Sequence, residues 1–178
     1  DPPLRETMLV RGDVDAITGF YFTSLLNLNA RGVKDEDIDV MMYPKYGANI
    51  YGNAIIVSDT FMKEKPDAVR GFLRAMTKGI RDVLADPDGS IRFVKERDAL
   101  IDEALEKRRM RLAIDSAIAT PIAKADGIGG VQPARLADMV TQVSAAFDLK
   151  NPVKPEQVWN GTFLPPKAEL NILPPAKK

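Results

Sequence analysis

The pattern of apolar and polar positions changes about one third of the way along the chain. In the first sixty residues, short runs at residues 14–17, 37–44 and 54–58 are typical of buried strands. Residues 4–10 and 23–32 instead carry apolar residues at helical spacing, and a glycine near the end of each suits a helix C-terminus. This part of the chain predicts strands alternating with short helices.

After residue 60 the spacing is helical almost throughout. Pro66 suits the first turn of a helix, and an apolar stripe at intervals of three and four follows it for about five turns. Residues 86–89 are expected to end this helix, and Ser90 to cap a short one. Two more amphipathic helices and a Pro-rich extended tail are predicted at residues 102–119, 133–147 and 151–178. The predicted fold class is α/β, helix-rich after residue 60.

Composition narrows the classes of protein that these elements can build. The 178 residues are 45% hydrophobic and 28% charged, which is typical of a globular chain. Lys plus Arg and Asp plus Glu both number 25, so the basic excess of a nucleic-acid binder is missing. No apolar run approaches the roughly 20 residues that span a bilayer, and the chain shows no signal-peptide pattern. We expect a small-molecule partner and no nucleic acid.

Two residue types are missing from the chain, and each removes a class of chemistry. There is no cysteine, so disulfides, thiolate nucleophiles and thiolate metal sites are excluded within these residues. There is no histidine, which excludes Ser-His-Asp and Cys-His hydrolysis and the commonest metal ligand. Carboxylates or lysines could still perform acid–base chemistry. Binding is favoured over catalysis, and we expect no cofactor, no metal and no catalytic residue.

The order of several segments resembles a known family. These are LVRGDVDAITGFY, YPKYGANIYGNAIIVSDTFMKEKPDAVRGFLRAMTKGIRDVLADPDGSI, KADGIGG and VWNGTFLP. The chain resembles the periplasmic substrate-binding proteins of ABC transporters over residues 4–164, most strongly over residues 54–75. The nearest branch binds nitrate, sulfonates, taurine and thiamine pyrimidine precursors. The resemblance implies a type 2 periplasmic binding fold.

The resemblance also implies a domain organisation. Proteins of this family are about twice as long, with two α/β lobes that clamp a ligand between them. By that pattern this chain corresponds to the C-terminal half. Residues 1–50 would end the second, smaller lobe, and residues 51–178 would return through the hinge into the first. Truncated sheets leave unpaired edges, so self-association of this chain is expected.

The first candidate site is the aromatic turn after residue 17. In open α/β sheets, ligands sit beyond the carboxyl ends of strands, and Gly19 would let the backbone approach one closely. The helix that follows would aim its free N–H groups at the ligand, between aromatic walls. The family pattern implies that the cleft is lined here by Thr18, Gly19, Phe20 and Tyr21. The alternative is that Phe20 belongs with Phe22 in the core.

The second candidate site is the stretch YGANIY. By the family pattern it would face the cleft near the hinge, with ligand contacts from Tyr46, Asn49 and Tyr51. The alternative is a polar loop with solvent-facing tyrosines. The basic run KRRMR at residues 107–111 and the GIGG loop at residues 127–130 are interpreted as a solvated helix face and a helix-entry loop.

The resulting hypothesis is a solute-binding component of an ABC importer that takes up a small organic nutrient by lobe closure. It implies a permease partner and a periplasmic or lipid-anchored location. A ligand-sensing domain of a transcription regulator is the alternative. An enzyme of the thiamine-pyrimidine synthase type is disfavoured, because its chemistry needs His and Cys. Aromatic walls with Asn and Tyr suit a planar heterocycle or an amine, but a thiamine precursor or a sulfonate stays open.

Overall fold

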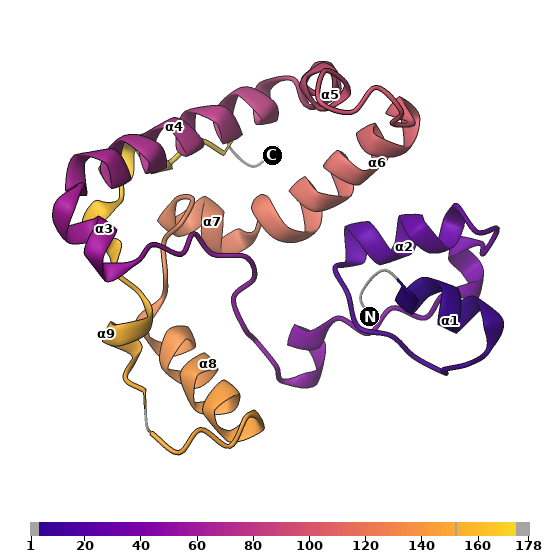
Figure 1. The fold of residues 1–178 in the computed structure, drawn as a ribbon, viewed down its shortest axis with the longest axis horizontal. Helices are drawn as coiled ribbons and strands as arrows, with labels where there is room; N and C mark the ends of the chain where they lie inside the picture. Colours follow the sequence, from indigo (N-terminus) through magenta and orange to yellow (C-terminus); the bar gives the residue numbers. More distant parts are fainter. Residues whose placement is uncertain (1–3, 152, 174–178) are drawn as a thin grey trace. The chain divides into compact units, whose positions relative to one another are not determined.

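A computed structural model describes residues 4–151 and 153–173, and within them every regular element is helical (Figure 1). Shorter turns lie at Asp35–Asp37, Tyr43–Tyr46, Ile114–Ile118 and Gly161–Phe163. Within the described residues, no helix is long and apolar enough to cross a membrane. The helices are α1 (Arg5–Arg11), α2 (Tyr21–Asn29), α3 (Asp59–Glu64), α4 (Pro66–Ala85), α5 (Pro87–Lys95), α6 (Glu103–Ala113), α7 (Pro121–Asp126), α8 (Pro133–Ala146), α9 (Pro155–Val158) and α10 (Lys167–Leu170).

The chain forms two compact units. The first unit contains the residues up to Val40 together with Val83–Ala119, and the second contains Met41–Asp82 and the residues from Thr120 onward. The division therefore falls within the last turn of α4. The predicted lobe boundary near residue 50 comes from the family pattern and not from the compactness of these two units. It stays a prediction.

The first unit is built around α2. Its side chains Leu25, Leu26 and Leu28 are buried, and Leu26 has no exposed surface. Helix α6 packs against both α2 and α5, and α5 contributes Ile91, which is 1% exposed. Full burial of one such side chain stabilises a fold by about 1.5–3 kcal/mol. These few leucine and isoleucine side chains therefore hold the first unit together.

Local chemistry explains where helices of the first unit begin and end. Helix α1 ends at Gly12, whose φ of +76° is the left-handed conformation predicted for this position. Helix α5 begins at Asp86, whose carboxylate accepts a hydrogen bond from the Gly89 N–H at 3.0 Å. The prediction that Ser90 caps this helix is therefore wrong. Pro87 occupies the first turn of α5, so Ser90 lies inside the helix. There its hydroxyl donates to the Asp86 carbonyl.

The second unit buries Val69 of α4, Leu136 of α8 and Leu170 of α10. Helix α8 packs against α9, and the Ile128 N–H donates to the Leu170 carbonyl at 3.0 Å. The predicted loop at residues 127–130 is confirmed. The tail from residue 151, predicted as extended, instead contains the short helices α9 and α10.

Most of the predicted helices are confirmed, and one of them changes character. Helix α6 covers the predicted segment 102–119 only to Ala113, and a wider π-type turn, Ile114–Ile118, completes it. Helix α4 forms as predicted, but its apolar stripe is unevenly buried. Phe72 is 54% exposed and Met76 42%, whereas Val69 is 5% exposed.

The three predicted strands are absent from the described residues. Residues 14–17 and 54–58 are non-helical segments without strand pairing, and residues 37–44 end in the turn Tyr43–Tyr46. A strand exists only when a neighbouring strand pairs with its backbone groups, and no such neighbour is present in the described part of the chain. Ile56, at the centre of the most apolar run, is 92% exposed. The helix-rich character is confirmed, but the α/β class is not.

We predict opposite effects of alanine at two glycines of the second unit. Gly127 has a φ of +86°, and a Cβ there would stand 2.9 Å from the Leu170 Cβ, so Gly127→Ala should lower the free energy of unfolding by about 1–3 kcal/mol. Gly79 lies inside α4 with open space around it, so Gly79→Ala should raise that free energy by about 0.5–1 kcal/mol. Urea unfolding followed by circular dichroism measures both. Equal effects would contradict the packing described here.

Candidate functional site

The first candidate site lies at the N-terminus of α2. Phe20 precedes the helix in an extended conformation, and its carbonyl accepts hydrogen bonds from the Thr23 and Ser24 N–H groups, both at 2.9 Å. No side chain caps this end of the helix. In the described part of the chain, no acceptor pairs with the backbone N–H groups of Tyr21 and Phe22. Two donors at the positive end of the helix dipole thus remain available.

Gly19 lies close to Ser24 in the turn that leads into α2. A Cβ at this position would stand 2.2 Å from the Ser24 Oγ, so the serine side chain would have to rotate away. The close approach of Gly19 to a ligand stays a prediction. Thr18, just before it, is held by its carbonyl, which accepts a hydrogen bond from Arg5 Nη1 at 2.7 Å.

The aromatic side chains form a small platform beside these donors. The rings of Phe20 and Phe22 stack with centroids 5.5 Å apart and planes 21° from parallel. Phe20 is 49% exposed, whereas Tyr21 and Phe22 are half-buried. Phe20 therefore presents ring surface to solvent. Its role in ligand contact stays a prediction.

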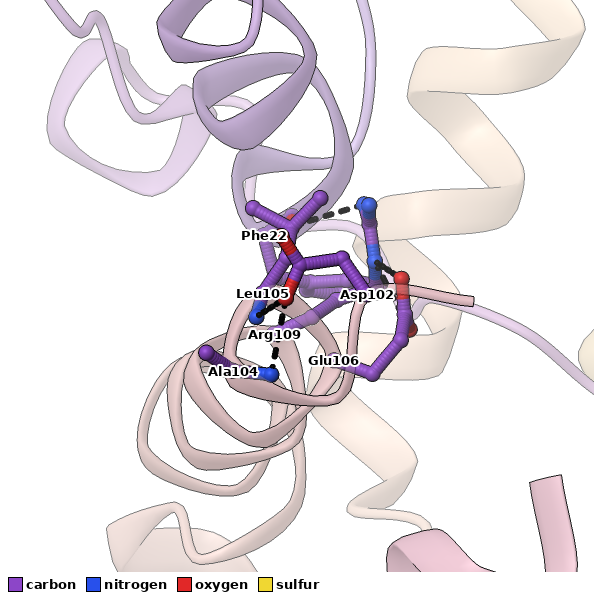
Figure 2. A network of polar contacts seen from close by, with 6 residues as sticks. All are labelled: Phe22, Asp102, Ala104, Leu105, Glu106 and Arg109. Carbon is purple, nitrogen blue, oxygen red and sulfur yellow. Dashed lines mark hydrogen bonds and ion pairs between the residues drawn. The ribbon is translucent and has the colours of Figure 1, made fainter. Parts of the chain in front are cut away.

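Arg109 of α6 fixes the first turn of α2 from the side (Figure 2). Its Nε donates to both carboxylate oxygens of Glu106, at 3.1 and 3.2 Å, and its Nη1 donates to the Phe22 carbonyl at 3.3 Å. The N-terminus of α6 is capped by Asp102, whose carboxylate accepts hydrogen bonds from the N–H groups of Ala104 and Leu105. Sequence reasoning missed Arg109, because its contact with the turn spans 87 residues.

The other two arginines of the basic run are also paired. Arg108 donates to Asn29 at 2.9 Å and to Asp35 at 2.7 Å, and Arg111 makes a bidentate ion pair with Asp88 at 3.0 and 2.6 Å. Residues 107–111, interpreted as a solvated helix face, are in part exposed and in part half-buried, and most partners of their arginines lie outside α6. No group of three acidic residues in the described ranges could hold a metal ion.

The second candidate site, residues 46–51, lies against α8 in the second unit. Tyr51 accepts a hydrogen bond at its hydroxyl from the Gln132 N–H at 2.8 Å, and its own N–H faces the Met139 Sδ at 3.3 Å. The Asn49 carbonyl accepts from Arg135 Nε at 3.1 Å. Tyr46, in contrast, is 70% exposed at the end of the turn Tyr43–Tyr46. The structure brings Asn49 and Tyr51 together and leaves Tyr46 apart.

Arg135 connects the residues of the second site. Its guanidinium stacks over the Tyr51 ring, 4.0 Å from the centroid, while Nη2 donates to the Ile50 carbonyl at 2.7 Å. Arg135 is the third residue of α8, directly after Pro133 and Ala134. The sequence shows an arginine in the first turn of this helix. It does not show the partner of that arginine, because the partner segment lies more than 80 residues earlier.

The two candidate sites belong to different units, residues 18–21 to the first and residues 46–51 to the second. Each is organised by an arginine that arrives from a distant helix, Arg109 and Arg135. Each combines an aromatic ring with backbone held in a defined conformation. Such surfaces suit flat organic molecules with a few polar atoms better than they suit acid–base catalysis.

Comparison with known proteins confirms, for residues 4–90, a resemblance of the kind predicted from the sequence. Residues 4–90 match the family model described as "NMT1/THI5 like". The chain is also similar to a protein of Chloroflexus aurantiacus named riboflavin-binding protein RibY. The two are 30% identical over 87 residues, which is 47% of this chain and 24% of the relative. The chain thus matches about a quarter of that relative's length, and no solved structure matches it.

We predict that two ion pairs of the first unit titrate independently. The hydrogen bond from Arg111 and its positive charge hold the pKa of Asp88 below its ordinary value, and Lys95 does the same for Glu103. Arg111→Gln should raise the pKa of Asp88 toward that ordinary value and leave Glu103 unchanged, while Lys95→Gln should do the reverse. Carboxyl carbon shifts followed by nuclear magnetic resonance between pH 2 and pH 7 measure both values.

The sign of the stability effect follows from these directions. A carboxyl whose pKa is lower in the folded state contributes stability above its unfolded pKa and loses it as pH falls through the folded value. Each variant should therefore lose stability relative to the parent at neutral pH, and the difference should vanish in acid. A difference that persists below both pKa values would contradict the ion-pair explanation.

We also predict that Arg135 orders the second candidate site. Arg135→Lys keeps the charge but loses the planar fork that reaches two carbonyls and the ring, so backbone amides of residues 47–52 should exchange with deuterium several-fold faster. Gln142→Ala removes one longer bond to the Gly47 carbonyl, 3.3 Å, and should change exchange less. Equal protection in the parent and in Arg135→Lys would show that the guanidinium does not order this segment.

Proposed function

We propose that this chain is part of a solute-binding protein that binds a small organic molecule carrying a planar heterocycle. One observation carries the proposal. The segment that matches the NMT1/THI5-like family contains the start of α2, where an exposed aromatic ring adjoins two unpaired backbone donors. The family and the relative's name support binding rather than catalysis.

The proposed contacts at α2 divide into apolar and polar ones. The Phe20 ring, supported from behind by Phe22, would stack on the face of the heterocycle. The N–H groups of Tyr21 and Phe22 would donate to its carbonyl or ring nitrogen atoms, assisted by the helix dipole. Thr18 and Gly19 would shape the backbone around it.

In the complete protein, we propose that Tyr46, Asn49 and Tyr51 contribute the remaining contacts in a cleft between two lobes. Residues 1–50 would end the smaller lobe and residues 51–178 would return into the first. Closure of the lobes would enclose the solute without making or breaking a bond. The Arg135 contacts would keep the Tyr51 ring in place during closure.

The remaining parts of the proposal rest on the family alone. The protein would deliver its solute to the permease of an ABC importer from the periplasm or a lipid-anchored position outside the cytoplasm. Self-association of this chain, expected from unpaired sheet edges, stays a proposal although the described residues contain no strand. Riboflavin is the first ligand to test, because the relative is named for binding it. A thiamine pyrimidine precursor or a sulfonate is the next.

Binding of riboflavin, measured by quenching of its fluorescence, tests the proposal on this chain and on the full-length gene product that contains it. We expect saturable binding to the full-length protein. Phe20→Ala should weaken it about 5- to 10-fold, because a stacked aromatic contact contributes about 1–1.5 kcal/mol. Phe147→Ala is the matched control, since Phe147 is 74% exposed and lies outside both candidate sites.

Calorimetry with thiamine and taurine extends the test to the other ligand classes. Tight binding of one of them, weakened by Phe20→Ala, would keep the site and change the ligand. A full-length protein that binds none of these compounds would overturn the proposal. Equal losses in Phe20→Ala and Phe147→Ala would overturn the assignment of the site.

A further inference from the structure

A groove of about 410 Å³ lies in the second unit, and its lining residues differ from those of both candidate sites. One wall is helix α4, with Arg74, Thr77, Lys78 and Arg81, and the other is the C-terminal segment around Glu169 and Asn171. Its volume falls within the range of pockets that hold small molecules. Leu170 keeps the second wall in place, because it is buried and its carbonyl accepts from the Ile128 N–H.

The cations of this groove lie on one helix face. Positions 74, 78 and 81 are four and three residues apart, so at 3.6 residues per turn they lie within roughly 60° of each other. Like charges at these spacings repel each other. Three cations against the carboxylates of Glu169 and Asp82 leave the groove with a local excess of one positive charge.

Carboxylates compensate this charge only in part. Arg74 Nε pairs with Glu169 at 3.2 Å, and Arg81 Nε lies 3.5 Å from the Asp82 carboxylate. No acidic side chain of residues 4–151 or 153–173 forms an ion pair with Lys78. Lys78 stands between two arginines, which makes it the position where an added anion gains most.

The polar neutral groups of the groove divide into occupied and available ones. Thr77 is 7% exposed, and its hydroxyl donates to the Leu73 carbonyl at 2.9 Å. Its hydroxyl proton is therefore already used within α4, and Thr77 only lines the groove. Asn171 is exposed beside the groove and offers an amide donor. Glu169 limits the site, because its carboxylate would repel an anion bound directly at Arg74.

We propose that this groove binds the phosphate group of a small molecule, held by Lys78 and Arg81. The Arg81 guanidinium is suited to two oxygens of one phosphate, and the Lys78 ammonium adds a point charge beside it. A phosphate fills only part of the volume, so an organic remainder lies along the C-terminal segment toward Asn171. This site is independent of the planar-ring site at α2.

Calorimetric titration of the full 178-residue chain with inorganic phosphate and with phenyl phosphate tests the proposal at low ionic strength. We expect saturable binding of both compounds, with phenyl phosphate the tighter. Lys78→Gln combined with Arg81→Gln should weaken each at least 10-fold. Lys63→Gln combined with Lys65→Gln removes the same charge from exposed positions outside the groove and should change affinity less than 2-fold.

A vesicle assay identifies the source of the phosphate group. If vesicles containing phosphatidylglycerol retain the chain and the double variant at residues 78 and 81 does not bind, the group belongs to a lipid headgroup. Binding of phenyl phosphate without vesicle binding assigns a soluble ligand. Absence of binding in both assays overturns the proposal, as does equal weakening by the two double variants. Phe20→Ala should leave phosphate affinity unchanged, which separates this site from the proposed function.

Discussion

Burial of the leucine face of α2 is the interaction on which the first unit depends. Leu26 is fully enclosed, Leu25 and Leu28 are nearly so, and α6 packs on α2 and on α5. Because few side chains are buried this deeply, the position of α2 is set by a small number of contacts. The first turn of α2 inherits that position, and Arg109 fixes it further through the Phe22 carbonyl. The geometry of the aromatic site thus follows from the core packing of the leucines one to two turns further along the same helix.

Signals that act over a few residues made most helices predictable. Gly12, Pro66 and Pro133 mark helix ends through backbone conformation alone, and helices end or begin at these positions as expected. The Ser90 cap was wrong because two competent caps stand four residues apart, and Pro87 favours the earlier one. The wider turn after Ala113 follows no local rule that the sequence exposes.

Signals that depend on distant partners could not be found in this way. The apolar run at residues 54–58 satisfies every local criterion for a strand, but pairing needs a second strand. The same limit applied to the candidate sites. Arg109 and Arg135 act on segments more than 80 residues away, and no pattern of neighbouring residues shows such partners. An arginine shows its charge in the sequence and its partner only in the fold.

The distribution of arginine partners separates two basic surfaces that look alike in the sequence. In the first unit, Arg108, Arg109 and Arg111 each pair with a carboxylate, and two of them also hold another polar group. These side chains connect α6 to its neighbours and have little capacity left for a ligand. In the groove on α4, Arg74 and Arg81 also pair with carboxylates, and Lys78 between them forms no ion pair within the described residues. The difference lies in what the side chains border: the arginines of α6 contact segments of the first unit, whereas Lys78 borders a groove. What basic side chains border, rather than their density, separates these two surfaces.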